Sequence, residues 1–245
     1  MASPRSSTLF HFTKSLLNTQ SILQQGFIPY YSLEDSTWLG AKLKFFACSM
    51  VCFCDIPIGR IQDHVGFYGS YGIGMSKEWA LKNGINSIAY YSAASTLSKI
   101  FIDGLRATID IKEKDTDKKI RSSFFGLLSY AKPIVGTMIV EDKPVSKEFY
   151  LENEWRYVPN KDGITNLVLR EKYDIVEERE KLKKMAEAEP LTFTPSDIRY
   201  IFVDTDADIP PIINFINEKL QHYSGVDLKI LSSRVTSLEH LKKDI

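Results

Sequence analysis

Residues 147–158 read Lys-Glu-Phe-Tyr-Leu-Glu-Asn-Glu-Trp-Arg-Tyr-Val, and charged side chains alternate with aromatic ones in the second half of this segment. The alternation predicts a strand from Leu151 to Val158, because aromatic and β-branched residues stand between polar ones. A period of two places Glu152, Glu154 and Arg156 on one face of that strand and the aromatic residues on the other.

Two carboxylates and a guanidinium on one strand face are costly to bury, so water, mutual pairing or a ligand must satisfy them. One interpretation is a solvated face that carries a Glu–Arg ladder. The other is a functional site, and the segments around His11, Cys52 and Tyr71 favour it. Both interpretations stay open at this point.

The composition is that of an ordinary soluble globular protein of 245 residues, with 44% apolar and 25% charged residues. This length fits one domain, and we predict a single domain over residues 1–245. Lys plus Arg and Asp plus Glu both number 31, so no global field attracts nucleic acid or membrane, and any such partner must meet a local patch.

The cysteine content and the N-terminus indicate a cytoplasmic protein without a membrane segment. The three cysteines are few, and Cys52 and Cys54 are too close along one strand to bridge easily. They share a strand face, but a second ligand pair for zinc is missing, so we expect small buried hydrophobic residues and no metal. The sequence shows no signal peptide and no apolar run of membrane-spanning length.

The segment Leu9–Thr13 predicts a short strand that leads into a helix, which Gly26 ends. His11 stands between two aromatic residues on this strand. It is either a buried, hydrogen-bonded core histidine or, because it lies at a strand-to-helix junction, a ligand contact.

The glycine-rich segment Asp63–Lys77 predicts a loop, then a strand from Tyr71 to Met75, and then a short helix that Ser76 caps. Tyr68 and Tyr71 lie beside glycines, which leave a slot where a flat ring can stack. A tight hairpin with aromatic packing is the alternative.

The remaining elements follow from periodicity and charge pairing. We predict an amphipathic helix over 93–111 whose core side carries Leu97, Ile100, Phe101, Leu105 and Ile109. We also predict a charged linker at Lys112–Lys119, a helix at 120–130, a strand at 134–140, a charged surface helix at Tyr173–Glu189, a strand at 199–203, a helix at 209–221 and a strand at 226–231.

Four features occur in order along the chain: His-Phe-Thr opening a helix, Cys-Phe-Cys-Asp-Ile-Pro, Tyr-Gly-Ser-Tyr-Gly-Ile-Gly-Met-Ser-Lys, and Glu-Asn-Glu-Trp-Arg-Tyr-Val. Together they resemble the AbiGi family of bacterial abortive phage-infection proteins, over most of residues 8–158 and more weakly in the tail. More distantly, the set resembles the ADP-ribosyltransferase superfamily. There His11, Tyr71 and Glu154 match the NAD-site residues by order, and Glu152–Glu154 matches an E-x-E turn.

The resemblance implies an α+β fold, an ADP-ribosyltransferase-like split β-sandwich of two mostly antiparallel sheets with surrounding helices. It also implies NAD as substrate and no metal. Glu154 would stabilise the positive charge that develops on the ribose when the nicotinamide bond breaks, and Glu152 would orient or deprotonate the acceptor. The residues implied to bind NAD are His11, Phe12, Thr13, Tyr68, Tyr71 and Arg156.

The function that this resemblance implies is a phage-defence toxin that transfers ADP-ribose from NAD to nucleic acid, with RNA favoured over DNA. Such a toxin needs a cognate antitoxin or inhibitor, for which the charged helix and the charged linker are candidate docking surfaces. The alternatives are transfer to a protein acceptor and a non-catalytic antitoxin or partner-binding protein of the same kind of system.

Overall fold

The computed structural model describes residues 6–40, 44–110, 115–140, 143–159 and 167–243, and it divides into two compact units. Unit 1 comprises residues 1–28, 52–86 and 190–245, and unit 2 comprises residues 29–51 and 87–189. The chain therefore builds each unit from segments that are far apart in the sequence. The expectation of a single domain over 1–245 stays a prediction.

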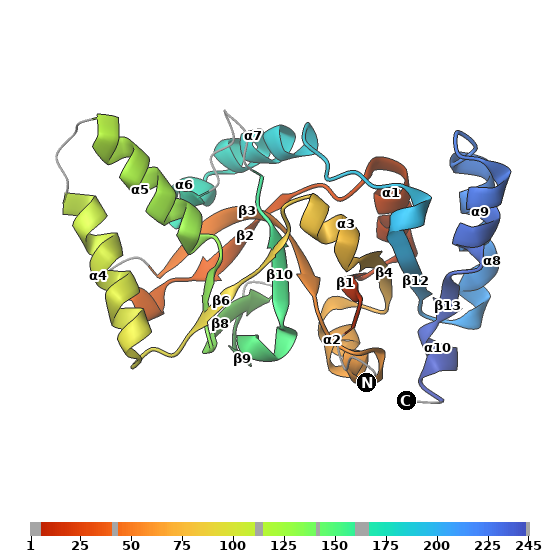
Figure 1. Ribbon diagram of the computed structural model, residues 1–245, viewed down its shortest axis with the longest axis horizontal. Coiled ribbons are helices and arrows are strands. Elements are labelled where there is room, and N and C mark those ends of the chain that lie inside the picture. The colour runs from red at the N-terminus through yellow and green to blue at the C-terminus, as the bar shows by residue number, and fades with distance from the viewer. Residues whose placement is uncertain (1–5, 41–43, 111–114, 141–142, 160–166, 244–245) are drawn as a thin grey trace. The chain divides into compact units, whose positions relative to one another are not determined.

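Unit 1 is built on a sheet with the strand order β13-β12-β4-β1-β3 (Figure 1). Its strands are β1 (Thr8–Thr13), β4 (Tyr71–Ser76), β12 (Ile198–Val203), β13 (Val235–Ser237) and the last three residues of β3 (Phe45–Cys54). β4 pairs antiparallel with both β1 and β12, and β13 pairs parallel with β12.

The helices of unit 1 are α1 (Leu16–Gln25), α2 (Ile61–Tyr68), α3 (Lys77–Lys82), α8 (Ile209–Lys219), α9 (Gly225–Ser232) and α10 (Leu238–Leu241). Ser15 and Ser76 cap α1 and α3 through their side chains, and Gly26 ends α1 with a positive φ of 86°. The predicted end of α1 at Gly26 and the predicted cap of α3 at Ser76 are therefore confirmed.

One face of the β1/β4/β12 sheet is packed with aromatic rings over two glycines. Phe10 and Phe12 lie opposite Gly74 and Gly72, where an added Cβ would approach within 2.9 Å of each ring. The ring of Phe202, from β12, stacks on the ring of Phe12 with 6.1 Å between ring centres. The slot that the sequence suggested for a ligand ring is thus filled by the protein's own side chains, as in the alternative of aromatic packing.

Two predicted elements of unit 1 are wrong. Residues 63–68 belong to helix α2 and not to a loop, because Ile61 and Val65 on one side of this helix bury against the aromatic face. Residues 226–231 belong to helix α9 and not to a strand, because Ser224 caps a helix whose Leu228 and Leu231 are buried. Short apolar runs do not distinguish a helix from a strand.

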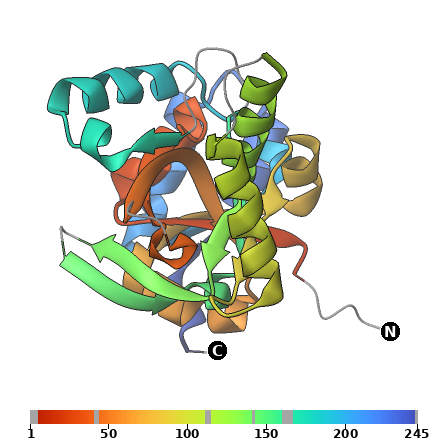
Figure 2. The ribbon, with the colours of Figure 1, turned by 90° about the vertical axis from the view of Figure 1, so that its left-hand side faces the viewer.

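Unit 2 contains the first seven residues of β3, which pair antiparallel with β2 (Tyr30–Asp35) and with β11 (Leu167–Leu169). β10 (Glu154–Tyr157) lies between β3 and β5 (Asn86–Ser87) in the strand order. β6 (Ala89–Tyr91) and β7 (Ala131–Pro133) form a parallel pair, and β8 (Val135–Val140) and β9 (Lys143–Glu148) form an antiparallel ribbon. Figure 2 shows this ribbon in green as a two-stranded arm.

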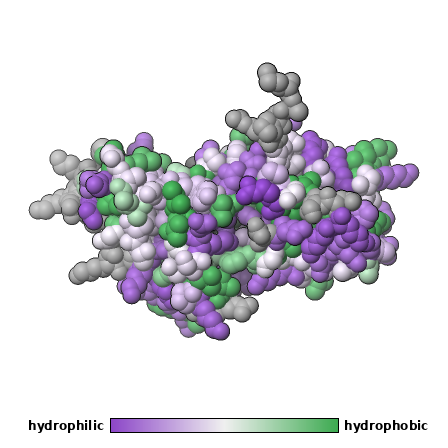
Figure 3. All heavy atoms as spheres, turned by 90° about the horizontal axis from the view of Figure 1, so that it is seen from below, coloured by the Kyte–Doolittle hydropathy of each residue, from purple (hydrophilic) through white to green (hydrophobic). Residues whose placement is uncertain are grey.

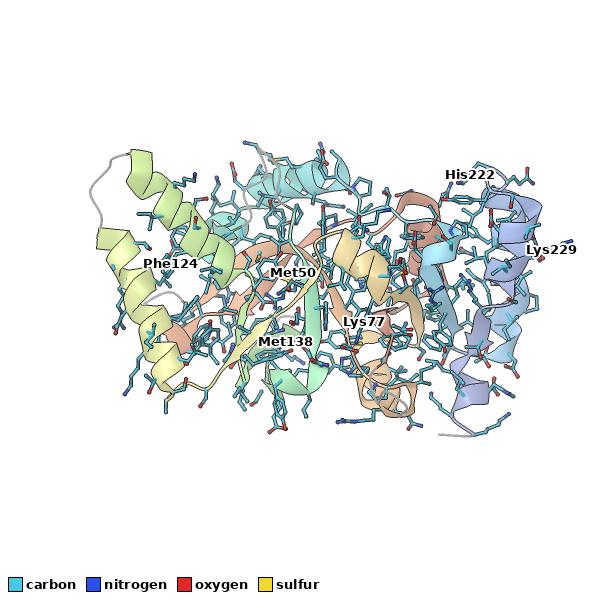
Figure 4. The ribbon with its side chains drawn as sticks, viewed as in Figure 1. Met50, Lys77, Phe124, Met138, His222 and Lys229 are labelled. Carbon is cyan, nitrogen blue, oxygen red and sulfur yellow. The ribbon has the colours of Figure 1, made fainter. Side chains whose placement is uncertain are left out.

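The helices of unit 2 are α4 (Thr96–Asp110), α5 (Asp115–Leu128), α6 (Arg170–Tyr173) and α7 (Val176–Glu187). α4 and α5 lie side by side, and a Cβ at Gly104 would be 2.8 Å from the Phe124 ring, which Figure 4 labels on α5. The predicted linker is partly wrong, because α5 begins at Asp115, while residues 111–114 lie outside the described residues. The predicted charged helix is present as α7, with α6 as a separate turn before it.

The predicted core side of α4 is only partly correct. Phe101 and Leu105 are buried, whereas Leu97 and Ile100 are 57% and 64% exposed. Periodicity alone cannot say how wide the buried stripe of a helix is.

The face in Figure 3 shows apolar areas, in green, scattered among polar ones, which is normal for a protein surface.

The strand predicted over 151–158 is correct only for its second half. Phe149–Glu152 forms a turn of 3₁₀ helix, η3, and β10 begins at Glu154. Between them Asn153 adopts a left-handed conformation with a φ of 42°, which asparagine tolerates better than most residues. Glu152 therefore lies on the turn before the strand, while Glu154 and Arg156 share the buried strand face as predicted.

The α+β class is confirmed, since helices surround sheets whose pairs are mostly antiparallel. The finer assignment to a split β-sandwich stays a prediction.

Gly69 offers a test of the close packing between the end of α2 and the backbone at Thr13 in unit 1. Gly69 ends α2 with a φ of 116°, and a Cβ there would lie 2.3 Å from the carbonyl oxygen of Thr13. We expect Gly69→Ala to lower the free energy of unfolding by about 2 kcal/mol or more, because backbone strain and a backbone clash add. Gly66→Ala is the matched control, since nothing lies within 4 Å of its Cβ position. In that helical position alanine stabilises by about 0.5–1 kcal/mol. Equal unfolding midpoints for the two variants in urea would contradict this packing.

Candidate functional site: the charged cluster of unit 2

The centre of the candidate site is the guanidinium of Arg156, which is completely buried in unit 2. Its Nε donates to Glu154 Oε1 at 2.6 Å and its Nη2 donates to Glu34 Oε2 at 2.7 Å. Its Nη1 donates to the carbonyl oxygen of Ser129 at 2.8 Å. One side chain of β10 thus joins β2 to the end of α5.

Lys132 of β7 extends this cluster to the second glutamate. Its ammonium lies 2.9 Å from Glu154 Oε2 and 3.4 Å from Glu152 Oε2, and 4.2 Å from the centre of the Phe149 ring. Lys147 of β9 reaches the other oxygen of Glu152 at 2.5 Å. Both oxygens of each predicted catalytic carboxylate therefore contact a cation.

The cluster balances its charges, with three glutamates and three basic residues in mutual contact. Burial works against the charged form of Lys132, but the carboxylates of Glu154 and Glu34 outweigh it and raise the pKa of this ammonium above its usual range. The backbone N–H of Glu154 donates to the hydroxyl of Tyr90 at 2.8 Å, and burial raises the pKa of that tyrosine. Buried charges of this kind are tolerable because each has a partner.

The electrostatics decide what Glu154 can do in this arrangement. A catalytic carboxylate that meets an oxocarbenium-like transition state must lower the energy of positive charge beside it. Here Arg156 and Lys132 already neutralise Glu154, and the residue is only 4% exposed. In this conformation the cluster is well suited to hold unit 2 together and poorly suited to stabilise additional positive charge.

His11 lies in unit 1, on the face of β1 opposite to Phe10 and Phe12. Its ring packs edge-on against Phe27, with 5.2 Å between ring centres. Its Nδ1 lies 2.8 Å from the carbonyl oxygen of Cys52, so Nδ1 carries the hydrogen and Nε2 is an acceptor in the neutral ring. Burial lowers the pKa of His11, and the hydrogen bond only partly opposes this shift. The geometry is close to that of a hydrogen-bonded core histidine.

Thr13 and Tyr71 share the sheet face of His11. The register places Thr13 directly opposite Tyr71, although 58 positions separate them in the sequence. The Tyr71 hydroxyl donates to Asp208 at 3.3 Å, and burial with the Asp208 carboxylate raises the pKa of this tyrosine. The structure thus brings three of the predicted NAD contacts, His11, Thr13 and Tyr71, onto one face.

Phe12 and Tyr68 do not join that group. Phe12 points to the opposite sheet face, where its ring lies 6.1 Å from Phe202, and His64 stands between it and Tyr68. The sixth predicted contact, Arg156, lies in unit 2.

Three residues of the cluster escaped the sequence analysis: Glu34, Lys132 and Lys147. Glu34 and Lys132 stand in segments of ordinary composition, and Lys147 stands before the strand that the segment 147–158 predicts. Only the folding of the chain brings these residues to Arg156 or Glu152. The signal that was available is the uncompensated charge itself. A buried face with two glutamates and one arginine requires further cations from elsewhere in the chain.

Among the described residues, the structure shows no group of three or more His, Cys, Asp or Glu side chains placed to hold a metal ion. No helix in that part of the chain is long and apolar enough to cross a membrane.

Arg156→Met tests the structural role of the cluster. Removing the guanidinium leaves the carboxylates of Glu34 and Glu154 buried without this positively charged partner. Breaking a buried ion pair in this way costs about 3–5 kcal/mol. We expect a loss of this size in the free energy of unfolding, measured in urea. Arg106→Met is the control, because its pair with Asp103 is exposed at 4.0 Å and exposed pairs contribute about 0–1 kcal/mol. If Arg156→Met lowers the free energy of unfolding as little as the control does, the charged cluster contributes little to the stability of the protein.

Comparison with known proteins agrees with the resemblance drawn from the four motifs. The family model described as "Putative abortive phage resistance protein AbiGi, antitoxin" matches residues 25–204. The abortive phage resistance protein AbiGi of Lactococcus lactis subsp. cremoris is 29% identical over 250 residues, which cover 89% of this chain and 99% of that protein. No solved structure matches the chain. Since the family model spans well over half of the sequence, the chain belongs to the AbiGi family.

Proposed function

We propose that the protein acts in phage defence as the antitoxin of an abortive-infection pair, and that it works by binding a toxin protein. The observation that carries this proposal is the family to which the chain belongs, whose description names both abortive phage resistance and an antitoxin. The defence role also agrees with the name of the Lactococcus relative.

The charged cluster of unit 2 supports a binding role over a catalytic one. Glu152 and Glu154 are the two carboxylates that the transferase interpretation needs, and both are occupied by lysine or arginine of the same unit. A residue that must stabilise a cationic transition state gains nothing from two adjacent cations. The pairing of these charges is instead that of a buried structural network.

A second candidate function is ADP-ribosyl transfer from NAD to nucleic acid, with RNA ahead of DNA, or to protein. The observation that favours it is the shared face of His11, Thr13 and Tyr71, which are three of the residues that the sequence resemblance implies to bind NAD. The acceptor on His11 Nε2 suits a ribose hydroxyl. In this candidate function Glu154 would act on the ribose, and the ADP-ribosyltransferase-like fold would be part of the proposal.

Growth assays distinguish the two roles. The genes that flank the gene of this chain are expressed one at a time in a phage-free host, with and without this chain. We expect one neighbour to arrest growth, this chain to restore it, and the two proteins to purify together. If this chain arrests growth when expressed alone, and no neighbour does, the protein is the toxin and the antitoxin proposal is wrong.

The transferase candidate is tested with purified protein, labelled NAD and RNA, DNA or cell lysate as acceptor. If Glu154 is catalytic, Glu154→Gln keeps the size of the side chain but removes its charge, and transfer slows about a hundredfold or more. Glu152→Gln should then affect transfer more than NAD hydrolysis, because its proposed role is toward the acceptor. Transfer by Glu154→Gln at the parent rate, or no transfer by the parent, excludes this candidate.

A further inference from the structure

Two arginines of unit 1 stand beside the same turn at one end of its sheet. Arg199 belongs to β12, and Arg234 is the residue before β13, the last strand in the described strand order (Figure 1). The turn is η4 (Pro195–Asp197), a piece of 3₁₀ helix that leads into β12. The backbone N–H of Ile201 donates to the carbonyl oxygen of Arg234 at 3.0 Å, so backbone contacts fix the two arginines relative to each other.

Both guanidiniums are hydrogen-bonded to carbonyl oxygens of this turn and of the residue after it. Nη1 of Arg234 donates to the carbonyl oxygen of Pro195 at 2.8 Å and also to that of Ile198. Nη1 of Arg199 donates to the carbonyl oxygen of Ser196 at 3.2 Å. Arginine side chains are long and lose much rotamer freedom when they are held in one place. Here three carbonyl oxygens of one short segment hold two of them.

A β-bulge in β12 coincides with the first of the two arginines. Between Met75 and Gly74, β4 advances by one residue, while β12 advances by two, from Ile198 to Tyr200. Arg199 is therefore the extra residue of the bulge. A bulge interrupts the regular pairing of a strand and re-aims a side chain, and bulges are over-represented beside active sites. The strand thus departs from regular geometry at the residue that brings a second cation to the turn.

The described residues do not compensate the charges of these two arginines. Within the described part of the chain neither guanidinium pairs with a carboxylate, and Nε and Nη2 of both donate to no group. Asp197, the acidic residue of the turn, uses its Oδ2 to accept from the backbone N–H and the hydroxyl of Thr194. Burial and the neighbouring charge of Arg199 lower the pKa of Arg234. An anion shared by the two guanidiniums would remove the repulsion between them.

We propose that Arg199 and Arg234 form a binding site for a phosphate group. The planar fork of one guanidinium already satisfies both oxygens of a carboxylate, whereas a phosphate has enough oxygens to accept from two forks at once. The N–H groups at Nε and Nη2 of the two side chains supply these donors. The site lies in unit 1, apart from the charged cluster of unit 2, and it does not depend on the antitoxin function.

Arg199→Gln tests the site, because it removes one fork and its charge from an exposed position. The probes are inorganic phosphate, a nucleoside 5′-monophosphate and a short RNA without terminal phosphates, titrated by calorimetry at constant ionic strength. We expect the parent to bind one or more of them saturably, and Arg199→Gln to bind about tenfold or more weakly, since charge-assisted hydrogen bonds are lost. Arg199→Lys keeps the charge but loses the fork, so its affinity should fall between the two. Arg60→Gln, at another exposed arginine of unit 1, is the matched control and should bind as the parent does.

The three probes also identify the source of the phosphate. Binding of a small phosphate without the RNA supports a site for a free phosphate or nucleotide, and binding of the RNA alone supports a site for the backbone of a nucleic acid.

Four results would overturn the proposal: no saturable binding of any probe by the parent, equal affinity of Arg199→Gln and the parent, an equal loss in Arg60→Gln, or tighter binding of an aspartate-rich peptide than of every phosphate probe. An equal loss in the control would indicate general attraction of anions. If Arg199→Gln does not fold, Arg199→Lys decides the question in its place, and affinity equal to that of the parent then contradicts the site.

Discussion

The buried guanidinium of Arg156 is the interaction on which unit 2 depends. It neutralises Glu154 on its own strand, whose face would otherwise be too polar for a core, and it joins two distant segments to that strand through Glu34 and the Ser129 carbonyl oxygen. Desolvating these charges costs several kcal/mol for each ion, so the network is stable only as a complete set. The network also favours the observed register of β10, which brings the guanidinium to Glu34 and to the Ser129 carbonyl oxygen together.

Unit 1 is organised by a different constraint, the close approach of aromatic rings to a glycine strand. Gly72 and Gly74 have no Cβ, so the Phe12 and Phe10 rings can lie directly over β4. The opposite sheet face then carries His11, Thr13 and Tyr71. The same strand pairing that packs the core therefore also brings together three of the residues that the sequence resemblance had suggested as NAD contacts.

Sequence reasoning succeeded where the signal was local. The cap at Ser76 and the shared face of Glu154 and Arg156 follow from short-range patterns. It failed at Asn153, whose left-handed backbone ends a turn and shifts Glu152 off the strand. It could not find Lys132 or Glu34, because their role exists only through pairing across many residues of chain.

The central claim is that Glu154 and Glu34 serve the structure by pairing with Arg156. A double-mutant cycle of unfolding free energies, with Arg156→Met, Glu34→Gln and the double variant, measures that pairing most directly. The account predicts that the double variant is more stable than the sum of the single losses implies, by about 2 kcal/mol or more, because the second change removes the charge that the first left unpaired. A coupling within about 0.5 kcal/mol of zero, the range for independent sites, would contradict it.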